Sequence, residues 1–102
     1  MALPRHLAVL GDVVKIKQAE TKAFSIYEEA NEDILGLALV LEDSILIRKD
    51  VPESHKRKIL AHEIFHIVCY KSGISQSIPA GIEENLCQLF SQIYFQLKKQ
   101  GL

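Results

Sequence analysis

The sequence has few of the residues that interrupt a folded chain, with 5 glycines and 3 prolines among 102 residues. It also has no repeat, low-complexity stretch or linker-like segment, so we expect a single domain over residues 1–102. A domain of this length buries only about 60–70% of the surface of its unfolded chain. Its core is therefore modest, and a bound metal ion would add to its stability.

Three further scarcities exclude classes of protein. Cys69 and Cys87 are the two cysteines, too few for a disulfide framework, and we expect both to be reduced. No apolar run approaches the about 18–20 residues that span a membrane, and Asp12 ends the N-terminal apolar run without a cleavage-like site. The formal net charge is −1, so no basic field attracts nucleic acid. We expect a cytoplasmic protein without a membrane or direct nucleic-acid partner.

The apolar patterns predict strands followed by two helices. Residues 11–18 alternate apolar and charged side chains, which indicates a half-buried strand. Residues 35–50 contain two apolar runs around a turn-compatible segment and predict a β-hairpin. Helices are predicted over residues 52–72 and 80–99. The order predicts an α+β fold, a small antiparallel sheet packed on two main helices.

Local sequence signals indicate where the first helix begins and ends, whereas the structure of residues 19–33 has two possible interpretations. Asp50 and Glu53 have the spacing of a capping box before the first helix, and Gly73 is suited to end it. The short basic run at residues 55–58 is interpreted as a solvated helix face. Residues 19–33 fit either a helix with Phe24 and Tyr27 inward or a loop containing one turn.

The most informative stretch is LAHEIFHIVCY, residues 60–70. His62 and His66, four apart, lie on one face of a helix and can chelate one ion, with Glu63 close by. This H-E-x-x-H pattern supplies two zinc ligands and a general base, which takes a proton from metal-bound water. The alternative is a pair of structural histidines. The strongly apolar surroundings favour zinc, because unpaired imidazoles and carboxylates are costly to bury.

Catalytic zinc takes three protein ligands, and no histidine follows His66. The third ligand is therefore expected on the last helix, as Glu83, Glu84 or, less favoured, Cys87. We favour Glu83 because it continues the apolar stripe expected to face inward, whereas Glu84 would point toward solvent. That stripe comprises Leu86, Phe90, Ile93 and Leu97.

Two segments resemble a known family: KRKILAHEIFHIVCYKSGI, and IEENLCQLFSQIYFQL after a short gap. They are similar to the ImmA/IrrE-type family of small gluzincin-like metallopeptidases, particularly phage- and mobile-element-encoded members, over residues 11–97. The resemblance implies a minimal gluzincin-like fold with His62 and His66 as zinc ligands and Glu63 as the general base. It also implies a glutamate ligand at the start of the last helix. Such proteins often carry Asp or Asn one turn after that glutamate, where this chain has Cys87 or Gln88.

These observations predict a zinc-dependent endopeptidase. The resemblance implies a cytoplasmic substrate, often a repressor-like regulator. An extended substrate could pair with an edge strand near Ile45–Ile47. The alternative is a non-catalytic, metal-stabilised module of phage or mobile-element origin that binds a protein without cutting it.

Overall fold

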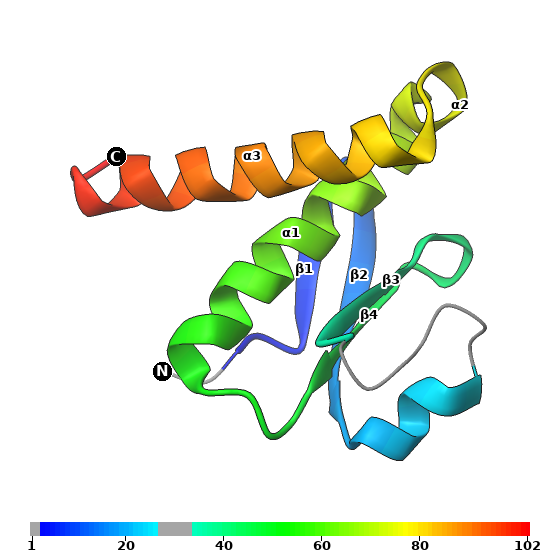
Figure 1. Cartoon of the computed structure of the whole chain (residues 1–102), viewed down its shortest axis with the longest axis vertical. Coiled ribbons are helices and arrows are strands. Elements are labelled where there is room, and N and C mark those ends of the chain that lie inside the picture. The colour runs from blue at the N-terminus through cyan, green and yellow to red at the C-terminus, as the bar shows by residue number, and fades with distance from the viewer. Residues whose placement is uncertain (1–2, 27–33) are drawn as a thin grey trace.

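The computed structural model of the protein describes residues 3–26 and 34–102. Its described part is α+β, a four-stranded mixed sheet with three α-helices (Figure 1). The strands are β1 (His6–Val9), β2 (Asp12–Ala19), β3 (Gly36–Leu39) and β4 (Ser44–Arg48). The helices are α1 (Glu53–Lys71), α2 (Ile74–Ser77) and α3 (Ala80–Lys99). Two 3₁₀ helices, η1 (Thr21–Ile26) and η2 (Val40–Glu42), complete it.

The predicted strand at residues 11–18 is confirmed as β2. Val14 and Ile16 are buried and the lysines between and after them are exposed, as the alternation requires. β1, which was not predicted, pairs antiparallel with β2 through a turn at Leu10 and Gly11. Both turn residues have positive φ, 49° and 88°, the backbone that tight hairpins need.

The predicted hairpin is also confirmed, because β3 pairs antiparallel with β4. The expected all-antiparallel sheet is wrong, since β4 pairs parallel with β2 and the strand order is β1-β2-β4-β3. β4 therefore lies inside the sheet, and the edge strand expected near Ile45–Ile47 is instead β3. The burial of Ile45, Leu46 and Ile47, at most 8% exposed, agrees with a strand covered on both faces.

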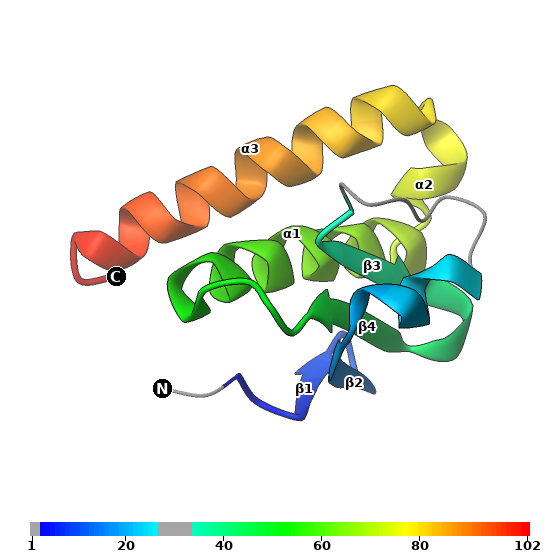
Figure 2. The same cartoon turned by 60° about the horizontal axis from the view of Figure 1, so that its bottom comes forward.

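Helix α1 lies between the sheet and α3 (Figures 1 and 2). The main core forms where α1 meets the sheet, while α3 contacts the body of the molecule through α1. None of the described helices combines the length and the apolar composition that a membrane span requires. The buried core residues are Leu3, Val9, Val14, Ile16, Ile45, Ile47, Leu60 and Ile67.

Both predicted long helices are present, but the start of α1 differs in detail. Asp50 does not cap the helix; its carboxylate instead accepts hydrogen bonds of 3.1 and 2.8 Å from the Arg48 guanidinium. The basic run is solvated except at Lys56, which is 6% exposed. Its Nζ donates to Gln18 Oε1 over 2.7 Å, which anchors the first turn of α1 to β2.

Two segments remain, the connection between α1 and α3 and the segment that follows β2. Gly73 adopts φ 85° directly after α1, as expected for a glycine that ends a helix. The connection to α3 contains the short helix α2. In the segment left open by the sequence, η1 covers Thr21–Ile26 and Phe24 is buried, whereas Tyr27 falls outside the described residues.

Candidate metal centre

The three residues of the H-E-x-x-H pattern lie together on α1, facing the cleft between β3 and α3. Glu63 is 7% exposed, while His62 and His66 are half-buried. Gly36 of β3 lies against this part of the helix. A Cβ there would clash with Ile59 Cγ2 and lie 3.3 Å from Glu63 Cγ, so only glycine lets β3 approach α1 this closely.

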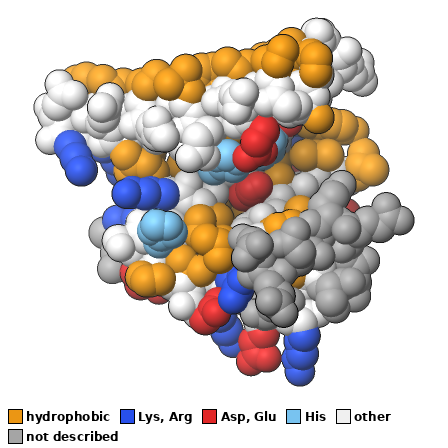
Figure 3. All heavy atoms as spheres, viewed as in Figure 1, with side chains coloured by type: hydrophobic (Ala, Val, Ile, Leu, Met, Phe, Trp, Pro, Cys, Tyr) orange, Lys and Arg blue, Asp and Glu red, His pale blue; other side chains and the backbone are white. Residues whose placement is uncertain are grey.

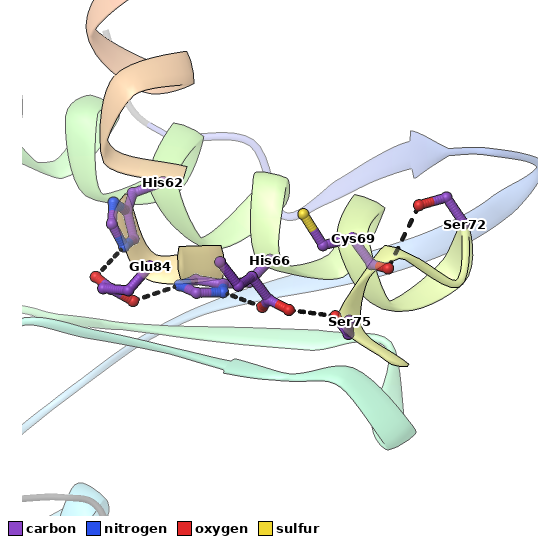
Figure 4. Close-up of polar contacts among 7 residues, drawn as sticks. His62, His66, Cys69, Ser72, Ser75 and Glu84 are labelled. Carbon is purple, nitrogen blue, oxygen red and sulfur yellow. Dashed lines mark hydrogen bonds and ion pairs between the residues drawn. The ribbon is translucent and has the colours of Figure 1, made fainter. Parts of the chain in front are cut away.

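The carboxylate of Glu84 joins the two histidines (Figure 4). Its Oε1 lies 2.7 Å from His62 Nε2, and its Oε2 lies 2.8 Å from His66 Nε2. The side chain of Glu84 is 58% exposed, so the carboxylate sits at the mouth of the cleft and not in the core. The Nε2 atoms of both histidines therefore face the two oxygens of one carboxylate that comes from a second helix.

Glu83 approaches His66 from the other side of the ring. Its Oε2 lies 2.6 Å from His66 Nδ1, and its Oε1 accepts a hydrogen bond from Ser75 Oγ of α2. The two ring nitrogens of His66 thus meet two different carboxylates. Ser75 fixes Glu83, and Glu83 fixes the orientation of the ring.

The predicted phase of α3 is wrong. Cys87 and Ser91 are its buried residues, whereas Phe90, Ile93 and Leu97 of the expected inward stripe are 39–43% exposed. The helix turns a narrow, partly polar strip toward α1 and leaves its most apolar face outside. Glu84 lies on this inner side and contacts both histidines, although it was expected to face solvent.

The pKa values follow from burial and from the facing charges. Burial raises the pKa of Glu63 to about 7, with a further increase from the nearby Glu84 charge and a partial decrease from His66. Burial lowers the pKa of His66, but contact with Glu83 and the charges of Glu63 and Glu84 outweigh it and raise it overall. Burial opposes ionisation of Glu83, yet hydrogen bonds from Ser75 and His66 hold its pKa below the ordinary value.

Among the described residues, two groups of side chains have ligand atoms within 4.8 Å of one another and could hold a metal ion. One is His62, Glu63 and His66, and the other is His66, Glu83 and Cys87. All four predicted site residues, the three on α1 and Glu83, therefore lie at one place. Glu84 belongs to neither group, although its carboxylate contacts both histidines. Cys69 and Cys87 are free, buried thiols whose pKa values are raised by burial, so both are neutral without a metal.

Ser75 and Gly36 contribute to the site but were not predicted from the sequence. Ser75 lies in a four-residue helix that leaves no periodic pattern to read. Gly36 did carry a signal, because a glycine within a predicted strand often marks a close backbone approach.

The cleft in front of these residues has a volume of about 1330 Å³. β3 forms one wall, α3 forms the other and α1 forms the floor (Figure 3). Glu63, the two histidines and both glutamates line one part of it, and His55, Lys58 and Lys99 line another. The site is therefore open to a ligand as large as a peptide segment.

Comparison with known proteins adds no assignment, because no protein-family model, no curated protein and no solved structure matches the chain.

Proposed function

We propose that the chain is a zinc-dependent endopeptidase in which His62, His66 and Glu84 hold the ion and Glu63 is the general base. The observation that carries this proposal is the convergence of two Nε2 atoms on one carboxylate, 2.7 and 2.8 Å away, beside a buried glutamate. Glu84 replaces Glu83 as the favoured third ligand, because Glu84 is the carboxylate that both Nε2 atoms face.

The donor set suits zinc. Two imidazole nitrogens and one carboxylate oxygen form a ligand set of catalytic zinc sites, which keep a fourth position open. Glu83, which receives His66 Nδ1–H, would act as the carboxylate that orients a metal-binding histidine.

Bound zinc would polarise the scissile carbonyl and make a water molecule more acidic. Glu63 would accept the proton of that water and pass it to the leaving amine. In the metal-free chain burial raises the pKa of Glu63 to about 7, and a nearby zinc ion would favour the ionised carboxylate that acts as the base.

β3 supports a peptide as the substrate. It is the edge strand beside the cleft, and one side of its backbone has no neighbouring strand among the described residues. An extended peptide could add to this edge and lie across Glu63. We propose a cytoplasmic regulatory protein as the substrate, in line with the family resemblance of residues 11–97.

The test combines metal content with hydrolysis of a peptide library, analysed by mass spectrometry. We expect about one zinc per chain and cleavage by the wild-type protein. Glu63→Gln should retain the zinc and lose at least about 100-fold of the hydrolysis rate, because the lost group moves a proton. Glu42→Gln, on the η2 turn, is the matched control and should change neither quantity.

Two results would contradict the proposal. A wild-type chain that binds no zinc would remove the metal centre. A zinc-loaded chain whose cleavage is the same with Glu63→Gln would not be a hydrolase of this kind, and the metal-stabilised binding module would then be the better description.

A further inference from the structure

The outer face of α3 is a row of large apolar side chains that remain partly exposed in the described structure (Figure 3). One of them, Phe90, also packs on Phe65 of α1, with 5.5 Å between the ring centroids. We define this outer face by its six large side chains, each 39–49% exposed. With about 150–250 Å² for a large side chain, these exposures leave on the order of 500 Å² of apolar surface. The members are Ile82, Leu89, Phe90, Ile93, Tyr94 and Leu97.

The same helix has no charge over most of its length. Between Glu84 and Lys98 there is no Asp, Glu, Lys or Arg, and the polar residues there are amides and one serine. A helix that faces water normally carries charges opposite its apolar stripe. An apolar patch of about 300–600 Å² is already the largest that a typical monomer exposes, and such patches often mark interfaces.

We propose that the outer face of α3 binds a second copy of this chain, with the two α3 helices antiparallel about a two-fold axis between residues 89 and 90. A two-fold interface must be complementary to itself. Under this arrangement Leu89 lies opposite Phe90, and Ile82, Ile93 and Leu97 also meet apolar residues, whereas Tyr94 meets Asn85. The other pairs are Leu86 with Ile93 and Ile82 with Leu97.

The charges at the ends of α3 fit the same arrangement. Glu83 and Glu84 lie at its start, and Lys98 and Lys99 lie at its end. Antiparallel packing keeps the like-charged ends of the two helices apart, and it also sets the two helix dipoles in opposite directions. A parallel arrangement would place like charges together at both ends.

The dimer would leave the metal centre open. The inner side of α3, with Cys87 and Ser91 buried against α1, is not part of the outer face. The interface would bury about 500 Å² of apolar area together with the flanking amide side chains. The total area per partner would then approach the value of about 800 Å² found in a standard interface. The inference does not depend on peptidase activity or on bound metal.

The first test is the mass of the purified full chain in solution, measured by light scattering and sedimentation over a range of concentrations. We expect a dimer. Ile93→Asp should weaken it at least about 30-fold, the loss typical of a central interface residue. Leu41→Asp makes the same kind of change at an 84%-exposed residue outside α3 and should leave the dimer intact. Circular dichroism checks that each variant is folded. If Ile93→Asp does not fold, Leu97→Asp serves as a second variant.

The second test measures the geometry by spin labels on Leu89→Cys and, separately, Leu97→Cys. Cys69 and Cys87 are at most 2% exposed, which favours labelling at the introduced position. The antiparallel dimer predicts a short distance between labels at 89 and an offset of about 22 Å along the helix axis at 97, from the rise of about 1.5 Å per residue. A monomer at every concentration, a dimer unaffected by both Asp variants, or equal short distances at 89 and 97 would overturn the proposal.

Discussion

Helices α1 and α3 have nearly the same length, 19 and 20 residues, and both supply the candidate metal centre, yet they are held in different ways. α1 lies between the sheet and α3 and buries six residues, among them Leu60 and Ile67. α3 packs mainly on α1, and its buried residues in the described structure are Cys87 and Ser91. The histidines are thus fixed by a core, whereas the glutamates that meet them are fixed by polar contacts.

This difference matters for metal binding. Core packing sets the position of α1 before any ion arrives, so His62 and His66 are pre-organised by the fold. Glu84 reaches them from a helix with little apolar burial, and its side chain is 58% exposed. An ion held by residues of both helices would therefore bind α3 to α1 and stabilise their contact.

The largest expected effect is the difference in unfolding free energy between a substitution in α1 and one on the outer face of α3. Ile67→Ala, at a fully buried position of α1, should lower the free energy of unfolding by about 2–5 kcal/mol. Leu89→Ala, on the outer face of α3, should change the unfolding of the isolated chain by no more than about 0.5 kcal/mol. Urea unfolding at concentrations low enough to keep the chain monomeric measures both.

Ile67→Val is the milder variant if Ile67→Ala does not fold, and it should cost about 0.5–1.5 kcal/mol. Equal losses at positions 67 and 89 would mean that α3 is buried in the monomer as deeply as α1, and the contrast between the helices would fail.

The second prediction concerns Glu63, the buried carboxyl of α1. Its pKa rises from 4.5 to about 7 on folding, so between these values the folded chain holds a proton that the unfolded chain has released. The stability of the metal-free protein should therefore fall as pH rises through this window, by about 1.4 kcal/mol per pH unit and on the order of 3 kcal/mol in total. The raised pKa of His66 acts in the same direction at higher pH.

The measurement is the thermal midpoint of chelator-treated protein between pH 4.5 and pH 8. Glu63→Gln, which cannot release a proton, should flatten most of the decline, and Glu42→Gln should preserve it. If Glu63→Gln keeps the wild-type slope, Glu63 is ionised in the folded chain and the burial argument for its pKa is wrong.

Sequence reasoning succeeded where a pattern has one structural meaning. The four-residue spacing of His62 and His66 fixes their common face once the helix exists, and the alternation around Val14 and Ile16 fixes the faces of β2. Both long helices and the hairpin were recognised for the same reason. The parallel pairing of β2 with β4 could not be read this way, because pairing depends on how the intervening chain crosses the sheet.

The error on α3 has a different cause. Its apolar periodicity was read correctly, but a periodic stripe shows only that a face is apolar and not what covers it. The stripe was assigned to the core, whereas the structure packs the side with Cys87 and Ser91 on α1. This rotation places Glu84, which was expected to face solvent, against both histidines, and for this reason we propose Glu84 in place of Glu83 as the third ligand.

The third prediction tests that exchange. Glu84→Gln should weaken zinc binding by more than about 100-fold, because it removes a charged ligand from a three-ligand site. Glu83→Gln should weaken zinc binding by about 10–100-fold, the range for a group that hydrogen-bonds to a metal ligand and fixes its orientation. Competition with a chromogenic chelator measures both affinities. A larger loss with Glu83→Gln than with Glu84→Gln would restore Glu83 as the ligand and favour the group of His66, Glu83 and Cys87.

The smallest expected effect concerns Ser75, which links the short helix α2 to the centre. Its Oγ donates to Glu83 Oε1, and Glu83 in turn meets His66 Nδ1. Ser75→Ala removes one hydrogen bond, worth about 0.5–1.5 kcal/mol, so zinc affinity should fall by about two- to tenfold. Ser77→Ala is the matched control, since the Ser77 hydroxyl bonds to the Gly73 carbonyl in the same short helix and should not affect the metal.

The double variant shows whether Ser75 acts through Glu83. If the serine works only by holding that carboxylate, Ser75→Ala should cost almost nothing further when Glu83 is already Gln, and the two losses will not add. Additive losses would show that Ser75 affects the metal by another route. Equal losses from Ser75→Ala and Ser77→Ala would show that α2 matters only as a connection, and that α3 is positioned at the centre by its contact with α1 alone.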